Sequence, residues 1–451
     1  MELSLRGGID SVGGNLGKVM AGSAVQSARF GSGKAFPKQS APDPDSRRCN
    51  NLWIIGFGLV GLTLKLVIAL NTYGSTDVVL FHVFAKSLSA NGLEWTYQHS
   101  NLFNHPPLVA YYLKLIFQLD HQKVLRESGF TFPVLLRLPG IVADFIVVMV
   151  LLEVSNSNPE FRIPRWALAL LALSPVSLMV SGFHGNTDPI MVMFLVLAAY
   201  ACLRDKPALS GLFLALSCQI KIVPLLLVPI FFFFWFHRRK VASFLFLFVL
   251  IFVSLWSYPL VKFPVVFAKN VLSYSGCWGV WGITYWLRLT GLQKFGVVGF
   301  FNLPVFEYIV INALKLVVII AVLTIAWRRR KLDARQLFDS VAYSWIVFFV
   351  FSPCVCAQYM VWFAPFVLVL SPLCYSWLTA SSALFLFFFY HITAGEFPWY
   401  IAMSKDSEDR WTPWTIFPWV TLIFAMILLW KKVAASSPPV RLVGHKQHSL
   451  K

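Results

Sequence analysis

The sequence predicts an all-α, polytopic helical membrane protein with about 12 transmembrane helices. Of its 451 residues, 58% are hydrophobic and only 13% are charged, whereas an average soluble domain is about half apolar and about a quarter charged. The mean hydropathy of +0.69 and the repeated long apolar runs are typical of proteins with several membrane-spanning helices. These runs are continuous and do not alternate with polar residues, which disfavours a membrane β-barrel.

The net charge of +18 comes largely from short basic clusters beside apolar segments. The clusters are Arg47-Arg48, residues 237–240, residues 328–331 and Lys431-Lys432. Such clusters mark the cytoplasmic loops of membrane proteins, so we expect a lipid bilayer and not a nucleic acid as partner. The seven cysteines show neither metal-ligand spacing nor an even disulfide framework, and we predict that even the pair in Cys354-x-Cys356 packs as small apolar residues.

The chain divides into three predicted regions. Residues 1–50 are basic, rich in Gly, Ser and Pro, and without periodicity, which predicts a disordered cytoplasmic tail. Residues 51–433 form the predicted membrane domain, and residues 434–451 form a second disordered basic tail on the same side. No apolar stretch precedes Leu52, which argues against a cleaved signal peptide.

Placing the basic clusters inside the cell orients the first spans. Span one, residues 52–71, runs outward and is followed by a long external loop, residues 72–130. This loop contains two candidate interfacial helices, Val78–Ala90 and Pro107–Leu119, and the second begins with a proline, a residue favoured at the first helical position. Spans two, three and four are predicted at residues 131–152, 166–182 and 190–203.

The stretch Pro207–Phe236 is ambiguous, because both flanks are basic and yet two full spans need about 40 residues. A hairpin of two short helices that turns near Lys221–Pro224 would satisfy both observations, and one tilted helix is the alternative. Span seven at residues 241–259 and a second external loop at 261–306 follow. Span eight is predicted to end at the Arg328 cluster. Spans nine to twelve are predicted at residues 338–353, 359–375, 378–394 and 413–430, which makes twelve spans with both termini inside.

In this topology the unusual polar residues collect at the external ends of the spans, while the internal side carries mainly Lys and Arg. This asymmetry indicates a site at the external membrane surface, although the simpler interpretation is that loops are polar. The residues concerned are Asp77, Asn104-His105-Pro106-Pro107, Arg137, His184, Asp188, Gln358, Tyr359, His391 and Glu396.

Asp77 lies in Gly74-Ser75-Thr76-Asp77, directly after the first span. An ionised carboxylate at the bilayer surface can deprotonate a molecule that arrives from water and attacks one held in lipid. The alternative is that Asp77 only caps the interfacial helix that begins at Val78.

Several ionisable residues lie within or beside spans. Arg137 and Asp144 are two helical turns apart on one face of span two, and such groups cost at least ~2.5 kcal/mol to insert, so they usually pair or serve a function. Asp144 could pair with a neighbouring span, whereas Arg137 lies near the external leaflet, where a lipid phosphate would be. Lys65 could extend to the membrane surface, and Lys221 could do the same or contact a phosphate.

His184 and Asp188 lie four residues apart in a turn that contains Gly and Asn. They would supply only two ligands to a metal ion. Asp188 could instead cap span four, with Pro189 at its first helical position.

The order of these motifs resembles the GT-C superfamily of integral-membrane glycosyltransferases, in particular the bacterial mannosyltransferase and arabinosyltransferase-like branches that use polyprenyl-phosphate sugars. The resemblance covers about residues 52–430. The motifs are Tyr73–Asp77, Asn104-His105-Pro106-Pro107-Leu108, Arg137-Leu138-Pro139-Gly140 with Asp144, Ser174-Pro175, Gly182–Asp188, Lys221-x-x-Pro224, and Gln358-Tyr359-x-x-Trp362 with Pro365.

The resemblance implies interfacial helices over the active site and a polyprenyl-phosphate-linked donor of a mannose-like hexose or a pentose. The acceptor would be a hydroxyl of a glycan, lipid or protein on the extracytoplasmic side. Asp77 would be the catalytic base, and Arg137 and Lys221 would bind the donor phosphate. The remaining predicted substrate-binding residues are His105, His184, Asp188, Trp281, Gln358 and Tyr359.

The resemblance leaves open a divalent cation, Mg²⁺ or Mn²⁺, because Asp77 is followed by Val78 and not by the second acidic residue of some members. It places the chain in the cell membrane of a bacterium or the endoplasmic reticulum of a eukaryote. A multi-span transporter or lipid flippase is the alternative function. A transporter would place charged residues near the bilayer midplane, in matching halves, whereas here they lie at one face.

Overall fold

The protein is described by a computed structural model that covers residues 44–435 except 101, 273–275, 292–295, 299–303, 332 and 404–407. The described residues from Arg47 onward form one compact unit. The predicted tails lie mostly outside the described residues, and the first helix already begins at Pro44.

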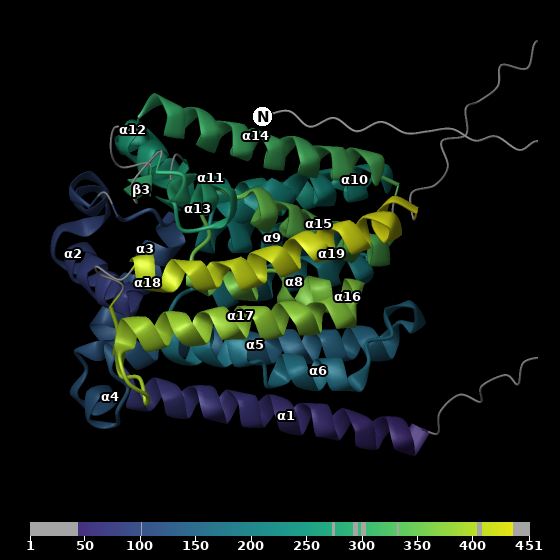
Figure 1. The fold of residues 1–451 in the computed structure, drawn as a ribbon, viewed down its shortest axis with the longest axis horizontal. Helices are drawn as coiled ribbons and strands as arrows, with labels where there is room; N and C mark the ends of the chain where they lie inside the picture. Colours follow the sequence, from purple (N-terminus) through teal and green to yellow (C-terminus); the bar gives the residue numbers. More distant parts are fainter. Residues whose placement is uncertain are drawn as a thin grey trace, which may run out of the picture. The chain divides into compact units, whose positions relative to one another are not determined.

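Long helices run side by side along one axis of this unit (Figure 1). They are α1 (Pro44–Asn71), α5 (Phe132–Ser157), α11 (Val241–Lys262), α14 (Val305–Arg328), α15 (Ala334–Phe351), α17 (Pro372–Ala394) and α19 (Ile416–Ala435). Shorter segments pack among them: α6 (Arg165–Ala172), α7 (Pro175–Ser177), η2 (Leu178–His184), α8 (Asp188–Leu203), α9 (Pro207–Ile220), η3 (Val223–Leu227), α10 (Val228–His237), η5 (Ala357–Val361) and α16 (Ala364–Leu370).

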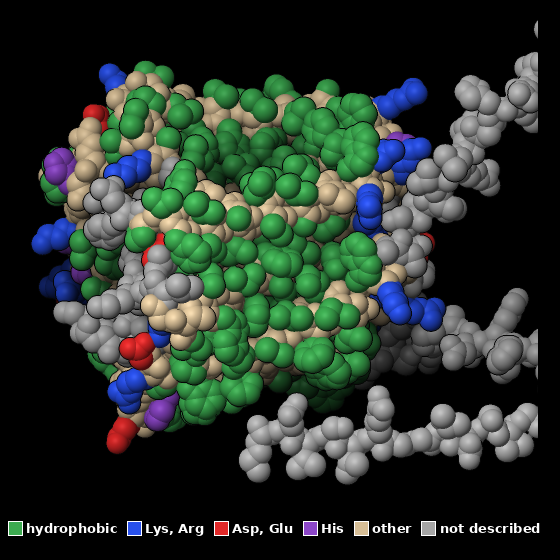
Figure 2. Space-filling view, turned by 45° about the horizontal axis from the view of Figure 1, so that its top comes forward, with side chains coloured by type: hydrophobic (Ala, Val, Ile, Leu, Met, Phe, Trp, Pro, Cys, Tyr) green, Lys and Arg blue, Asp and Glu red, His purple; other side chains and the backbone are tan. Residues whose placement is uncertain are grey.

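The outer surface of the bundle is apolar, as a bilayer requires. Side chains such as Val253 and Ile319 are 57% and 45% exposed, and Figure 2 shows a broad apolar belt between two ends that carry the charged side chains. Among the described residues, 7 helices are long and apolar enough to cross a membrane. These observations confirm a helical integral membrane protein. Each predicted span contains helix, but the number that crosses the membrane stays a prediction.

The stretch from Pro207 to Phe236 forms two helical segments, α9 and η3–α10, with an extended residue at Lys221 between them. The ammonium of Lys240 pairs with Asp205, and the Trp235 Nε1–H donates to Ser210 Oγ over 3.2 Å. Both ends of the stretch therefore lie together, which confirms the hairpin.

The end of the bundle opposite the Asp205–Lys240 contact carries short segments (Figure 1). The predicted interfacial helices are present as α2 (Thr76–His99) and α3 (Pro107–Asp120), and α4 (Lys123–Glu127) follows. The other segments are α12 (Pro264–Phe267), η4 (Ala268–Leu272), α13 (Gly282–Leu289), α18 (Glu408–Trp411), η6 (Thr412–Thr415), the parallel pair β1 (Gly74–Ser75) and β4 (Ile401–Ala402), and the antiparallel pair β2 (Gly276–Trp278) and β3 (Gly296–Val298); η1 (Pro159–Phe161) follows α5.

Candidate active site

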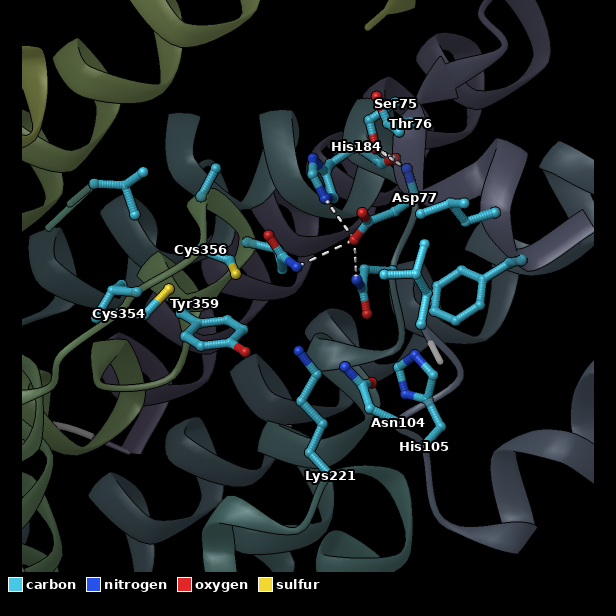
Figure 3. Close-up of a pocket in the computed structure, with 18 of the residues that line it drawn as sticks. Ser75, Thr76, Asp77, Asn104, His105, His184, Lys221, Cys354, Cys356 and Tyr359 are labelled. Atoms are coloured by element: carbon cyan, nitrogen blue, oxygen red, sulfur yellow. Dashed lines mark hydrogen bonds and ion pairs between the residues drawn. The ribbon is translucent and has the colours of Figure 1, made fainter. Parts of the chain in front are cut away.

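A cavity of about 600 Å³ opens at this end of the bundle. Segments far apart in the sequence meet around it: the start of α2, the loop before α3, the turn before α8, the α9–η3 break and η5. Figure 3 shows their polar side chains around the space. They are Ser75, Thr76, Asp77, Asn104, His105, His184, Asn186, Lys221, Gln358 and Tyr359.

Asp77 is anchored through one carboxylate oxygen. Its Oδ2 accepts hydrogen bonds from Nε2 of His184 at 3.1 Å, Nδ2 of Asn186 at 2.5 Å and Nε2 of Gln358 at 3.1 Å. All three bonds end on Oδ2, and 29% of the side chain is exposed. Within the described part of the chain Oδ1 has no such partner, so it is available to a substrate.

The surroundings keep Asp77 ionised. Burial raises the pKa of its carboxyl, but the electrostatic attraction of His184 and Lys221 and the hydrogen bonds from His184 and Asn186 outweigh burial and lower the pKa to about 2. The capping interpretation of Asp77 is wrong, because Ser75 is the N-cap of α2 and its Oγ accepts from the backbone N–H of Asp77 at 3.2 Å. The carboxylate therefore binds side chains of other segments and stays charged at neutral pH.

His184 reaches Asp77 because the chain changes winding before it. Residues Leu178–His184 form a π-helical turn that ends at Gly185, whose φ of 79° is left-handed. A Cβ at Gly185 would come within 2.4 Å of Val78, so only glycine fits this turn. Such π-helical segments are frequent at functional sites, and this one brings His184 and Asn186 to the same carboxylate oxygen.

Lys221 supplies the cavity with an ammonium group. Since α9 ends at Ile220 and Lys221 is extended, its side chain leaves the helix and points into the cavity, facing Asp77 (Figure 3). Its Nζ lies 2.9 Å from Asp188 Oδ1 and 4.2 Å from the centre of the Tyr359 ring. The neighbouring Trp362 donates its Nε1–H to the same Asp188 oxygen at 2.5 Å. One carboxylate and one aromatic face thus hold the ammonium in place.

Asp188 itself is fully buried and does not line the cavity. It does not cap α8 either, because Thr187 occupies the N-cap position. The structure therefore places Asp188 behind Lys221, as its counter-ion, and not in direct contact with a substrate.

His105 lines the cavity beside Phe81, with ring centres 5.0 Å apart. Burial and the nearby Lys221 charge lower the pKa of its imidazole to about 3, although Asp77 opposes them. His105 is therefore neutral at physiological pH and can serve as a hydrogen-bond partner, not as a cation.

Arg137 lies outside the cavity, 1% exposed. Its guanidinium donates to the carbonyl oxygens of Ala69, Thr72, Pro133, Gly182 and Phe183 and to Thr72 Oγ1. These contacts tie the end of α1 to the end of η2, so they argue against the predicted phosphate contact. Arg137 holds the scaffold under His184 instead.

Trp281 does not line the cavity either, although the neighbouring Val280 does. Trp281 is fully buried, and its Nε1–H donates to the Phe349 carbonyl oxygen at 2.7 Å. Stacking on a sugar is therefore not open to it.

Asp144 forms the predicted ion pair with a neighbouring span, because its Oδ2 lies 2.8 Å from Lys65 Nζ. Lys65 is 3% exposed, so its predicted extension to the membrane surface is wrong.

Some cavity groups were not among the predicted site residues. Asn186 is one of them, although an amide in the Gly-containing turn with His184 and Asp188 was a signal that the sequence offered. Asn104 was expected at the external surface together with His105, and it lines the cavity. Cys354 and Cys356, predicted as packing residues, both line the cavity wall.

The residues of the cavity do not fit a divalent cation. Within the described chain no group of three His, Cys, Asp and Glu side chains could hold a metal ion. Asp77 supplies the only carboxylate among the described lining residues, and its Oδ2 is occupied by three N–H donors. Mg²⁺ and Mn²⁺ prefer several oxygen ligands, so no step is assigned to either.

Comparison with known sequences supports a class of protein. It favours an integral membrane glycosyltransferase of the GT-C type, in agreement with the resemblance of the motifs. Residues 134–353 match the sequence profile of glycosyltransferase family 87. This segment contains His184, Asp188 and Lys221, begins after Asp77 and ends before Gln358. No curated protein matches the chain.

Proposed function

We propose that the protein transfers a sugar from a polyprenyl-phosphate-linked donor to an acceptor hydroxyl in this cavity, on the extracytoplasmic side of the membrane. The observation that carries the proposal is the pairing of one anchored carboxylate, Asp77, with one held ammonium, Lys221, across a single cavity. The first is suited to take a proton, and the second is suited to bind a phosphate.

The charge of the cavity favours a lipid monophosphate over a nucleotide diphosphate as leaving group. Lys221 is the only Lys or Arg among the described residues that line the cavity, and His105 is neutral. Because Asp188 already pairs with this ammonium, it can contact one phosphate group, and a nucleotide diphosphate sugar would leave its second phosphate without a cation. Ile222 and Val223 also line the cavity beside Lys221, so an apolar wall adjoins the expected phosphate position.

The reaction needs one base and one stabilised leaving group. The acceptor oxygen attacks the anomeric carbon while the bond from that carbon to the phosphate oxygen breaks. Oδ1 of Asp77 takes the hydroxyl proton as the new bond forms. The polyprenyl phosphate leaves with the bond electrons, and the Lys221 ammonium stabilises its added charge.

The test is a transfer assay in membranes that contain the full chain. Radiolabelled mannose, glucose or a pentose is supplied on a polyprenyl phosphate, and a parallel reaction receives the same sugar on a nucleotide. We expect a labelled product from at least one lipid donor and none from the nucleotide sugar once lipid-linked sugar synthesis is blocked. Transfer from the nucleotide sugar alone would overturn the proposal.

Controls separate catalysis from transport and from damage to the fold. Glu127→Gln changes a carboxylate at the same end of the bundle that is 67% exposed and outside the cavity, so it should keep full transfer. Movement of the labelled lipid across vesicles without a transferred product would favour the flippase alternative.

A further inference from the structure

We propose that Tyr390 is a positioning residue that fixes the tautomer of His184, so that His184 presents an N–H to Asp77. The observation is a chain of two hydrogen bonds. The Tyr390 hydroxyl lies 2.9 Å from His184 Nδ1, and His184 Nε2 lies 3.1 Å from Asp77 Oδ2. The tautomer assignment stands without the proposed function. Only the expected effect on kcat rests on it, because there Asp77 is the catalytic base.

The hydrogen positions follow from what each partner can do. An ionised carboxylate only accepts hydrogen bonds, so His184 Nε2 must carry the hydrogen. A neutral imidazole then has its lone pair on Nδ1, and the Tyr390 hydroxyl is the group that faces it. The tyrosine therefore donates, and its hydroxyl selects the tautomer through the nitrogen remote from Asp77.

The surroundings allow little freedom in this arrangement. Tyr390 is fully buried in α17. Its ring packs edge-on against Phe183, with ring centres 5.1 Å apart, and at a tilt against Trp399, with ring centres 5.5 Å apart. The backbone carbonyl of His184 accepts from Ser75 Oγ at 2.8 Å. The imidazole is 4% exposed, so water has little access to Nδ1 if the hydroxyl is removed.

Tyr390→Phe removes this hydroxyl and keeps the ring. Nδ1 then loses its donor, and the tautomer with hydrogen on Nδ1 directs the Nε2 lone pair at the Asp77 carboxylate. Asp77 loses one of its three anchors in that state. We expect kcat to fall about tenfold with an unchanged donor KM, because a neutral hydrogen bond contributes at most about that factor.

The direct test is ¹⁵N NMR of the full chain in nanodiscs with labelled histidine. His184→Gln assigns the signal by its disappearance. We expect wild-type His184 to be protonated at Nε2 only, and Tyr390→Phe to contain the Nδ1–H form. Protonation of both nitrogens in the wild type, or an unchanged tautomer in the variant, overturns the proposal. The wild-type spectrum decides even if the variant does not fold.

A double-mutant cycle supplies the functional readout. Glutamine can donate to Asp77 but has no tautomers, so Tyr390→Phe should lower kcat about tenfold in the wild type and less than about twofold in the His184→Gln background. A purely structural role predicts equal losses in both. Tyr375→Phe, at another buried tyrosine of α17 outside the cavity, should leave kcat unchanged. If no donor is used at all, the proposed function fails while the NMR result still stands.

Discussion

Asp77→Asn separates the chemical role of this carboxylate from its structural role. The oxygen at the Oδ2 position receives three N–H groups, from His184, Asn186 and Gln358. An asparagine must keep its carbonyl oxygen there, because its NH₂ group in that place would face three donors. The NH₂ group then occupies the Oδ1 position, where it cannot accept the proton of the acceptor.

The two expected magnitudes differ widely. General-base assistance contributes about 10²–10⁴ in rate, so kcat should fall at least ~100-fold, which corresponds to about 2.7 kcal/mol of barrier. The pKa of Asp77 falls from 3.8 to about 2 on folding, which limits the lost stability at pH 7 to about 2 kcal/mol. The amide oxygen still accepts the same bonds, so the actual loss should be smaller and the protein should insert normally.

The assay compares initial rates of transfer from a polyprenyl-phosphate sugar at equal amounts of membrane-inserted protein. Glu127→Gln is the matched control, since it makes the same chemical change on an exposed carboxylate of α4. Turnover by Asp77→Asn within a few-fold of the wild type would refute the assignment of Asp77 as the base.

Three further predictions test the scaffold, the electrostatics and the topology. Arg137→Gln should reduce folded protein and transfer in parallel, with an unchanged donor KM, because it breaks buried bonds to the ends of α1 and η2; a selective rise in donor KM would contradict this. Asp77 keeps its charge down to about pH 2, so it should produce no acid limb in kcat/KM between about pH 5 and 8, and stabilisation from it should vanish only as pH falls through that low pKa; a limb near pH 6 that Asp77→Asn abolishes would contradict this. A cysteine at Lys123, 86% exposed, should react with an impermeant maleimide in intact cells, whereas one at Lys240 should react only after permeabilisation; the reverse result would invert the topology.

The fold class could be predicted from the sequence because long apolar runs and basic clusters are local signals. The charge at both flanks of 207–236 left a hairpin or one tilted helix open, and the contact of Asp205 with Lys240 decides for the hairpin. The two helices of the first external loop were also expected, and the first breaks at Gly92, whose φ is 83°, two residues after its predicted end at Ala90. The composition of a run of consecutive residues determines these elements, and the sequence shows that composition directly.

The site could be predicted only in part, because its geometry depends on contacts between distant segments. Asp77, Lys221 and Gln358 were expected, and the structure brings all three to one cavity. Arg137 was misjudged, since depth in a span does not reveal that six acceptors from three segments occupy its guanidinium. Tyr390 gave no signal, because one more aromatic residue in a span is ordinary until a histidine is seen beside it.

We assign donor binding to Lys221 and proton transfer to Asp77, and a measurement of donor binding separates these two roles. Lys221→Gln combined with Asp188→Asn replaces the ion pair by a neutral pair, so neither charge is left buried alone. A charge-assisted hydrogen bond contributes about 1.5–3 kcal/mol, so loss of the ammonium should weaken binding about 10- to 100-fold.

The measurement is equilibrium binding of a radiolabelled polyprenyl-phosphate sugar to the full chain in nanodiscs. We predict that Asp77→Asn binds the donor as tightly as the wild type and that the Lys221→Gln, Asp188→Asn variant binds it at least ~10-fold more weakly. Undiminished binding by the double variant, or loss of binding in Asp77→Asn, would contradict the account of this site.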